Sequence, residues 1–288
     1  ETYKALEASK AWSKAEMIAP KQFREEISPY FNANPKKYIS ALVSEDCWQA
    51  TPGKVVDLVR NLGIAAGGTV MEDCRVLEAC REGKYTSVLV QTHDKKYVEY
   101  RTEHFVNALG SGAGKLCDSM GIDAGLYPVR HQAFITRRLP MLGKHGTNLD
   151  MLIDRQDYKG FSAVYGQQIA YTGQIIGCAS PKLDAMRIDK NLKVNTKAFL
   201  EIVSEMFSEW IPDLAGVGIQ AVWAGYYTEP RYIVDPELGL FVGMRGHGFM
   251  LSQYIARMYV DKLLGRPVPE YFEKLKLNGP GLSEKAFK

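Results

Sequence analysis

The stretch Leu238-Gly239-Leu240-Phe241-Val242-Gly243-Met244-Arg245-Gly246-His247-Gly248-Phe249 joins an apolar run to a glycine-rich turn. The apolar run predicts a β-strand, and the residues that follow it, 250–264, place their large apolar side chains at helical spacing. A strand that leads through such a turn into a helix directs backbone N–H groups and the positive end of the helix toward one point. We therefore expect residues 243–249 to bind a negatively charged group. His247 lies between two glycines of this turn and is either a site residue or a capping or core histidine.

A second glycine-rich turn, Gly110-Ser111-Gly112-Ala113-Gly114, follows a short apolar strand and precedes a predicted helix. Glycines in this position let a backbone approach a phosphate closely. The turn lacks the third glycine of a dinucleotide fingerprint, and Lys115 is not followed by the Ser or Thr of a phosphate-binding loop. On its own this segment is more typical of a plain tight turn.

The remaining periodicity predicts a mixed α/β (α+β) chain. An amphipathic helix is expected at residues 52–62, and antiparallel hairpins are expected between residues 69 and 101, with a first strand at 69–71. After residue 126 the sequence changes to several strand-like segments followed by a helical run, which predicts a separate sheet-and-helix domain. Its expected elements are strands at 129–136, 160–166 and 168–176 and a helix at 196–210, and residues 2–31 are expected to form helices followed by a loop.

Composition narrows the class of protein. The chain has 288 residues, 46% hydrophobic and 24% charged, with 36 Lys or Arg against 33 Asp or Glu. This near balance, with charges interspersed, argues against a nucleic-acid partner. The absence of a long apolar stretch argues against a transmembrane segment, and the sequence predicts a cytoplasmic protein. The five scattered cysteines predict free thiols and no metal site.

Several segments, taken in order, resemble the flavoprotein superfamily of D-amino-acid oxidase, sarcosine oxidase and glycine oxidase. Phe105-Val106-Asn107-Ala108-Leu109-Gly110 resembles the family's "vvNAaGaw" strand and turn, with Leu109 and Ser111 as departures. Gly243-Met244-Arg245-Gly246-His247-Gly248-Phe249 resembles "GfsGHGf". The other matching segments are residues 46–52, 68–76, 127–132 and 223–230, so the resemblance covers roughly residues 20–265.

The resemblance implies an FAD-binding Rossmann-like domain, incomplete in this chain, and a substrate domain with an antiparallel mixed sheet and helices. It assigns residues 1–40 to substrate-domain helices and a linker, 41–122 and 225–288 to the middle and C-terminal parts of the FAD-binding domain, and 123–224 to the substrate domain. Members of the superfamily open with a Gly-x-Gly-x-x-Gly segment that this sequence does not contain. We therefore expect a polypeptide that carries this segment to complete the site, whether it is a separate chain, a cleaved part or a stretch omitted from the sequence.

The activity implied is hydride transfer to flavin N5 from a small amino acid or secondary amine such as proline, sarcosine or glycine. Glycerol 3-phosphate or another hydroxy compound is the alternative substrate, and a noncatalytic subunit or assembly factor is the alternative function. Sarcosine oxidases carry a Lys where this chain has Met250, which favours a dehydrogenase that passes electrons to a partner subunit or a quinone. The nearest cysteine to the family's flavin-linking position is Cys178, so the FAD is expected to be noncovalent.

Site residues follow from the same resemblance. An Arg can bind a substrate carboxylate through two parallel hydrogen bonds, and the candidates are Arg231 and Arg245, with His247 near the flavin ring and Tyr226 as a substrate hydrogen-bonding residue. Tyr227 and Tyr232 are further hydrogen-bonding candidates. The expected cofactor-binding residues are Val76, Ala108, Gly110, Gly243, Met244, Gly246, His247, Gly248, Phe249 and Met250.

Overall fold

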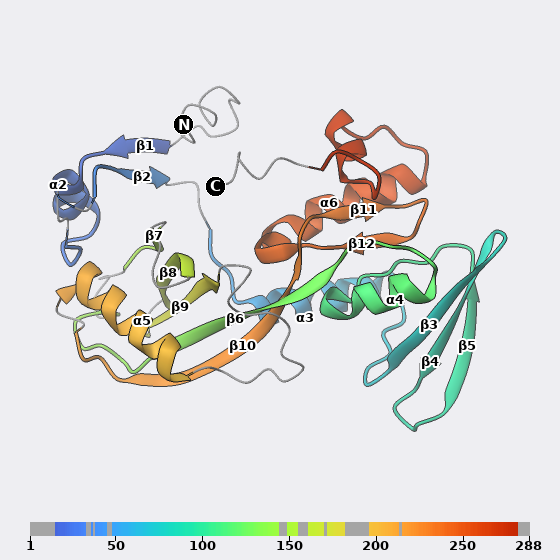
Figure 1. Ribbon diagram of the computed structural model, residues 1–288, viewed down its shortest axis with the longest axis horizontal. Coiled ribbons are helices and arrows are strands. Elements are labelled where there is room, and N and C mark those ends of the chain that lie inside the picture. Colours follow the sequence, from blue (N-terminus) through green and yellow to red (C-terminus); the bar gives the residue numbers. More distant parts are fainter. Residues whose placement is uncertain are drawn as a thin grey trace. The chain divides into compact units, whose positions relative to one another are not determined.

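The structure is a computed structural model. It describes residues 15–32, 36, 38–44, 48–143, 149–154, 161–169, 172–181, 196–212 and 215–281. The chain divides into two compact units: the first contains Glu1–Cys47, Val129–Tyr226 and Lys285–Lys288, and the second contains Trp48–Pro128 and Tyr227–Glu284 (Figure 1). Each unit is therefore built from separated stretches of the chain.

A five-stranded sheet forms the centre of the first unit, with the strand order β10-β6-β9-β8-β7. The pairs β6–β9, β7–β8 and β8–β9 are antiparallel. Helix α5 packs on this sheet. The bounds are β6 Tyr127–Thr136, β7 Leu152–Asp154, β8 Phe161–Ile169, β9 Gln174–Pro181, α5 Thr196–Trp210 and β10 Ile219–Glu229. The expected helix at 196–210 and the strand at 129–136 are confirmed. The other two strands lie further along the chain than expected, because the turn between them is at Gly173 rather than near residue 167.

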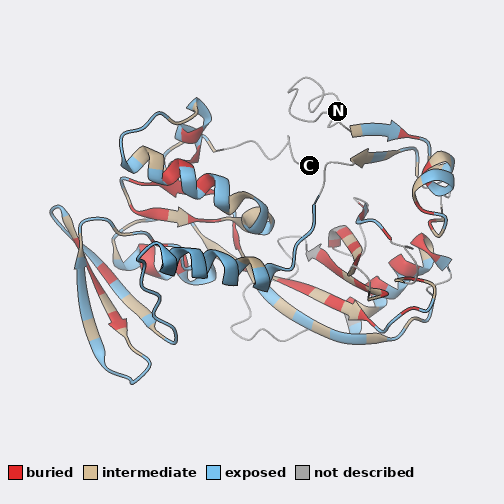
Figure 2. Ribbon diagram, turned by 180° about the vertical axis from the view of Figure 1, so that it is seen from behind, coloured by how far each residue is buried: buried red, intermediate tan, exposed pale blue. Residues whose placement is uncertain are grey.

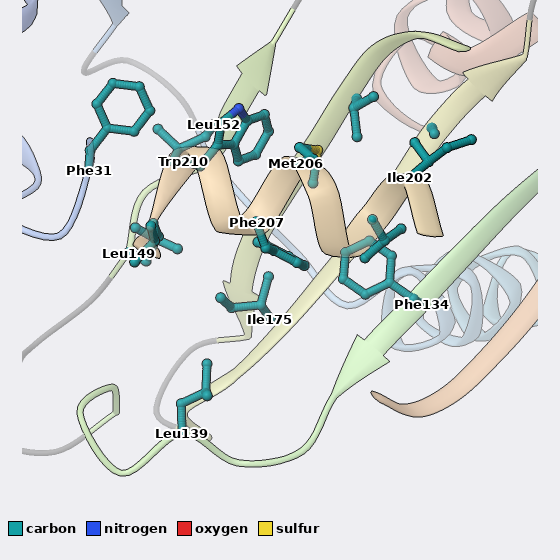
Figure 3. Packing of buried hydrophobic residues seen from close by; sticks show 14 of the residues in the cluster. Phe31, Phe134, Leu139, Leu149, Leu152, Ile175, Ile202, Met206, Phe207 and Trp210 are labelled. Atoms are coloured by element: carbon teal, nitrogen blue, oxygen red, sulfur yellow. The ribbon is translucent and has the colours of Figure 1, made fainter. Parts of the chain in front are cut away.

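The core of the first unit lies between α5 and the sheet (Figure 3). Buried side chains recur along α5 at helical spacing, and the Phe207 ring meets Phe134 of β6 edge to face at a centroid distance of 5.3 Å. Each such side chain stabilises the fold by about 1.5–3 kcal/mol through burial alone. The indole N–H of Trp210, at the end of α5, donates to the buried Asp154 carboxylate over 3.0 Å.

The N-terminal prediction is partly wrong. Residues 1–14 lie outside the described part, and Ala15–Ile18 is a strand, β1, which pairs antiparallel with β2, Ala41–Ser44. The strand forms by pairing with a segment more than twenty residues further along the chain, and a prediction from neighbouring residues does not include this pairing. A short helix α2, Pro20–Gln22, and a π-helical turn η1, Phe23–Ile27, follow, and Ile18 and Phe23 are buried in the core of the unit.

The second unit contains the expected antiparallel hairpins, in the order β3-β4-β5. The strands are β3 Arg75–Glu82, β4 Tyr85–Gln91 and β5 Tyr97–Thr102, and one face of the sheet packs against Leu116 of α4, Ala113–Ser119. The strand expected at residues 69–71 is not formed: these residues are exposed and precede the first paired residue, Arg75. Asp73 with φ of +54° interrupts the extended chain between them.

A two-stranded antiparallel ribbon, β11 Ile233–Asp235 and β12 Leu240–Val242, has helices on both faces. Ile233, Leu240 and Val242 pack with Ala113 and Cys117 of α4. Val234 and Phe241 point the other way, into a cluster with Ile255, Met258 and Tyr259 of α6, Gly248–Leu263. The part of the chain described here is thus a mixed α/β protein with antiparallel sheets, as expected (Figure 1).

Helix α3, Pro52–Ala65, confirms the helix expected at 52–62 but contains no buried residue. It is the pale-blue helix near the centre of Figure 2. Five of its large apolar side chains are exposed: Val56, Leu58, Val59, Leu62 and Ile64. No helix among the described residues is both long and apolar enough to span a bilayer.

Candidate functional site

The segment around Asn107 runs parallel to β12 of the second unit at one isolated bridge. Asn107 forms a parallel bridge with Leu240: the Asn107 N–H donates to the Gly239 carbonyl over 2.8 Å, and the Phe241 N–H donates to the Asn107 carbonyl over 3.0 Å. Each of the two segments leads through a short 3-10 turn into a helix: the Asn107 segment through η2, Gly110–Gly112, into α4, and β12 through η4, Arg245–His247, into α6. Ligands of α/β proteins bind outside the carboxyl ends of such strands, so both glycine-rich turns lie at one candidate site.

Asn107 holds the first turn in place. Its side chain is 1% exposed; Nδ2 donates to the Ala113 carbonyl over 3.1 Å, and Oδ1 accepts the Leu109 N–H over 3.2 Å. One buried amide thus ties the strand end, the turn and the first residue of α4 together. Asn107 lies in a segment that resembles the family but was not predicted to have a role, although a polar amide between an apolar segment and a glycine turn is a signal in the sequence.

Gly243 makes the second turn possible. Its φ is +71°, and a Cβ atom at this position would lie 1.9 Å from the main-chain oxygen of Arg231. Only glycine fits such a close approach. Further along the turn, a Cβ on Gly246 would lie 3.0 Å from the Tyr227 ring. The glycines therefore bring the turn against the end of β10 and the segment that follows it.

Four polar side chains form a cluster beside the N-terminus of α6. The Arg245 Nε donates to the Glu229 carboxylate, and their side chains are only 17% and 8% exposed. The Tyr232 hydroxyl and His247 Nδ1 are 2.6 Å apart in a hydrogen bond. Arg245 adopts φ of +49°, a value that non-glycine residues rarely take. Glu229 was not among the predicted residues, because nothing in a local motif indicates that it contacts Arg245.

The electrostatics of the cluster keep His247 neutral. Burial lowers the pKa of His247 from its ordinary value of 6.5, and the positive charge of Arg245 lowers it further. Burial also raises the pKa of Tyr232. At neutral pH the imidazole is therefore uncharged, with one nitrogen as a donor and the other as an acceptor, and the Tyr232 hydroxyl orients the ring.

Comparison with known proteins identifies the family. The sequence model of the family described as FAD dependent oxidoreductase (DAO) matches residues 1–262. The chain belongs to this FAD-dependent oxidoreductase family. No curated protein sequence matches the chain significantly.

Solved structures of the same fold include three that illustrate the range of relatives. L-proline dehydrogenase from P. horikoshii has a TM-score of 0.72 and 24% identity, over 91% of this chain and 68% of that chain. Glycine oxidase from Geobacillus kaustophilus has a TM-score of 0.71 and 15% identity, over 94% and 68%. Iminodiacetate oxidase from Chelativorans sp. BNC1 has a TM-score of 0.69 and 13% identity, over 97% and 71%. At these identities the similarity concerns the fold.

FAD is the cofactor of this family, and the residues of the second unit fit it. The first turn of α6 carries N–H groups without intrahelical partners. These groups can donate to a carbonyl oxygen or an anionic atom at the polar edge of a flavin ring. Phe249 and Met250 in that turn, and Leu109 beside the other turn, are large apolar side chains left 48%, 67% and 42% exposed. A flat aromatic ring system with one polar edge would cover such a surface.

The structure places the predicted residues in four different environments. Residues 243–250 lie in one turn and the start of α6, and Ala108 and Gly110 lie at the neighbouring turn. Val76 lies in β3 and packs with the hairpin core. Arg231 donates to the main-chain carbonyls of Leu277 and Gly279, which is a structural contact. Tyr226 belongs to the other compact unit. The roles of all these residues stay predictions, and in the described part of the chain no group of His, Cys, Asp or Glu could hold a metal ion.

Proposed function

We propose that the chain is the catalytic part of an FAD-dependent dehydrogenase that oxidises a small amino acid or a secondary amine. One observation carries the proposal: the segment at Asn107 bridges β12 in parallel, and each of these two segments leads through a glycine turn into a helix, with His247 in the second turn. The names of the structural neighbours, proline dehydrogenase, glycine oxidase and iminodiacetate oxidase, support the substrate class.

The residues of the chain would act by position and charge. Bound FAD supplies a hydride acceptor at flavin N5. The N-terminal turn of α6 would place N–H groups and partial positive charge at the pyrimidine edge, where negative charge develops on reduction. His247, held at Nδ1 by Tyr232, would donate or accept one hydrogen bond at its other nitrogen without adding a charge.

The electron acceptor is proposed to be a partner subunit or a quinone. Met250 is 67% exposed at the start of α6 and places an apolar thioether at this position. In sarcosine oxidases a Lys at the matching position helps the reduced flavin react with oxygen, and this chain has no cation there. The FAD is proposed to be noncovalent, because the family's linking cysteine has no counterpart here and the thiols of Cys117 and Cys178 are buried.

A polypeptide partner is also proposed. Five large apolar side chains of α3 are exposed, and the apolar face of such a helix is normally covered. About a third of each neighbour's chain has no counterpart in the alignment. These two observations support a further polypeptide segment that covers α3 and completes the FAD-binding unit. The protein is also proposed to be cytoplasmic.

The test is anaerobic reduction of the FAD-loaded protein, with any copurifying chain retained. Proline, sarcosine, glycine and glycerol 3-phosphate are added separately, and loss of the oxidised flavin spectrum is followed, with dye reduction and oxygen consumption measured in parallel. Bleaching by an amine with dye reduction and little oxygen consumption is the expected result. Bleaching by glycerol 3-phosphate alone would change the substrate class, and a bound flavin that no substrate reduces would favour a noncatalytic subunit.

Met250→Lys is the matched variant for the electron acceptor. The position is exposed, so the fold should tolerate the change. We expect oxygen consumption to rise about tenfold or more while the rate of flavin reduction by substrate is unchanged. An unchanged reaction with oxygen would contradict the role assigned to this position.

A further inference from the structure

The contact between Glu229 and Arg245 is a buried ion pair that the proposed reaction does not require. Glu229 is the last residue of β10 and Arg245 is the first residue of η4, so the pair joins a strand end to the turn before α6. Buried ion pairs contribute little net stability, because the cost of removing two charges from water offsets their attraction. The pair is therefore better explained by its effect on the local charge than by stability.

The position of Arg245 makes its charge significant. The guanidinium belongs to a residue three positions before Gly248, where α6 begins. A cation near a helix N-terminus is unfavourable, because the helix dipole is positive at the same end. Glu229 supplies the compensating negative charge, and its carboxylate contacts the guanidinium directly. The turn then presents the partial charge of the helix end without a full additional positive charge.

We propose that Glu229 is a positioning residue that holds Arg245 and sets the positive potential at the flavin-binding turn. Through this potential it sets how strongly the site stabilises a reduced, negatively charged flavin. The inference rests on the proposed placement of the flavin at residues 243–250. It assigns a function to a residue outside the matching glycine motif, and it assigns Arg245 a role in charge tuning in addition to any contact with substrate.

Two single variants separate charge from structure. Glu229→Gln keeps the size and one hydrogen-bond acceptor but removes the negative charge, so the potential at the turn should rise. Arg245→Gln removes the positive charge, so the potential should fall. The double variant should return close to the original potential. An exposed pair in the same unit, Lys84 with Glu103 at 2.9 Å, provides the control variant Glu103→Gln.

The main readout is the affinity of the FAD-loaded protein for sulfite, which binds more tightly when the flavin surroundings are more positive, together with the flavin midpoint potential. We expect Glu229→Gln to tighten sulfite binding about tenfold and Arg245→Gln to weaken it about tenfold, the effect of one charge at short range. The double variant should lie within about threefold of the original protein, and Glu103→Gln should leave the affinity unchanged. Shifts of both single variants in the same direction, or no shift, would overturn the proposal.

A second readout does not need the flavin. The His247 imidazole contacts Tyr232 and feels the charge of Arg245, which pairs with Glu229, and its titration in the FAD-free protein can be followed by NMR. Glu229→Gln should lower the His247 pKa and Arg245→Gln should raise it. If the His247 titration shifts as expected while sulfite affinity and midpoint potential do not change, the flavin does not lie at this turn, and both this inference and the proposed site are wrong.

If Glu229→Gln does not fold, Arg245→Lys and Arg245→Gln give the same test from the other partner. The Lys variant keeps the charge and loses the planar guanidinium contact. A weaker sulfite affinity in the Gln variant alone would support charge tuning. An equal loss in both variants would show that only the contact geometry matters, and would overturn the proposal.

Discussion

Replacing Gly243 with Ala should damage the fold more than the same replacement at Gly265. Both glycines have nearly equal φ angles, +71° and +68°. The left-handed conformation therefore costs a new Ala side chain about the same at both positions, roughly 1–2 kcal/mol. The surroundings differ: the new Cβ would lie 1.9 Å from the Arg231 oxygen at position 243, whereas no atom lies within 4 Å at position 265.

The difference between the two variants measures the steric overlap. An overlap of more than 1 Å with a main-chain oxygen forces the Arg231 segment or the turn to move, which costs about 1–3 kcal/mol or more. We expect Gly265→Ala to lose about 1–2 kcal/mol of unfolding free energy and Gly243→Ala about 2–5 kcal/mol, with a lower FAD affinity in Gly243→Ala alone. Urea denaturation, compared at constant m-value, and FAD fluorescence titration measure the two effects. Equal losses in both quantities would refute the reasoning.

Three further outcomes are expected. Asn107→Ala should lower the free energy of unfolding by about 2–4 kcal/mol, because it leaves the Leu109 N–H and the Ala113 carbonyl without their buried partner. The control Asn61→Ala, at an exposed position, should lower it by less than about 1 kcal/mol. Similar losses in urea denaturation would contradict the role of Asn107. The folded state binds fewer protons at His247 than the unfolded state. The free energy of unfolding should therefore fall as the pH decreases below about 6.5 and through the lowered pKa of His247 in the folded state. A His247→Asn variant with an unchanged pH dependence of stability would contradict this. Trp210→Phe should lower the free energy of unfolding by about 1–3 kcal/mol, because no indole N–H donates to Asp154. An unchanged stability in thermal denaturation would show that this hydrogen bond is dispensable.

Local patterns predicted the elements that depend on neighbouring residues. The helices α3, α5 and α6 were predictable because their apolar side chains recur at helical spacing, and the glycines at the turns marked where strands end. The strand β1 was not predictable in this way, because its pairing partner β2 lies far along the chain. The sequence around Ala15–Ile18 contains too few residues to establish a period by itself.

The site shows the same limit. The turn at residues 243–249 was recognisable from its glycines and His247 alone. The contact between Glu229 and Arg245 depends on where β10 ends relative to a turn sixteen residues later, and the hydrogen bond from Tyr232 to His247 depends on the same geometry. Which side chain neutralises or orients another is therefore a product of the tertiary fold, and local motifs do not specify it.

The bridge between Asn107 and Leu240 has a consequence for biosynthesis. The ribosome makes the first strand and its glycine turn long before it makes the second, and most of the other compact unit is synthesised in between. The segment around Asn107 therefore lacks its parallel neighbour until the residues around Leu240 have been synthesised. With the flavin at residues 243–250, as proposed, cofactor binding would follow the synthesis of this turn, and a chain truncated shortly before residue 240 would lack the turn.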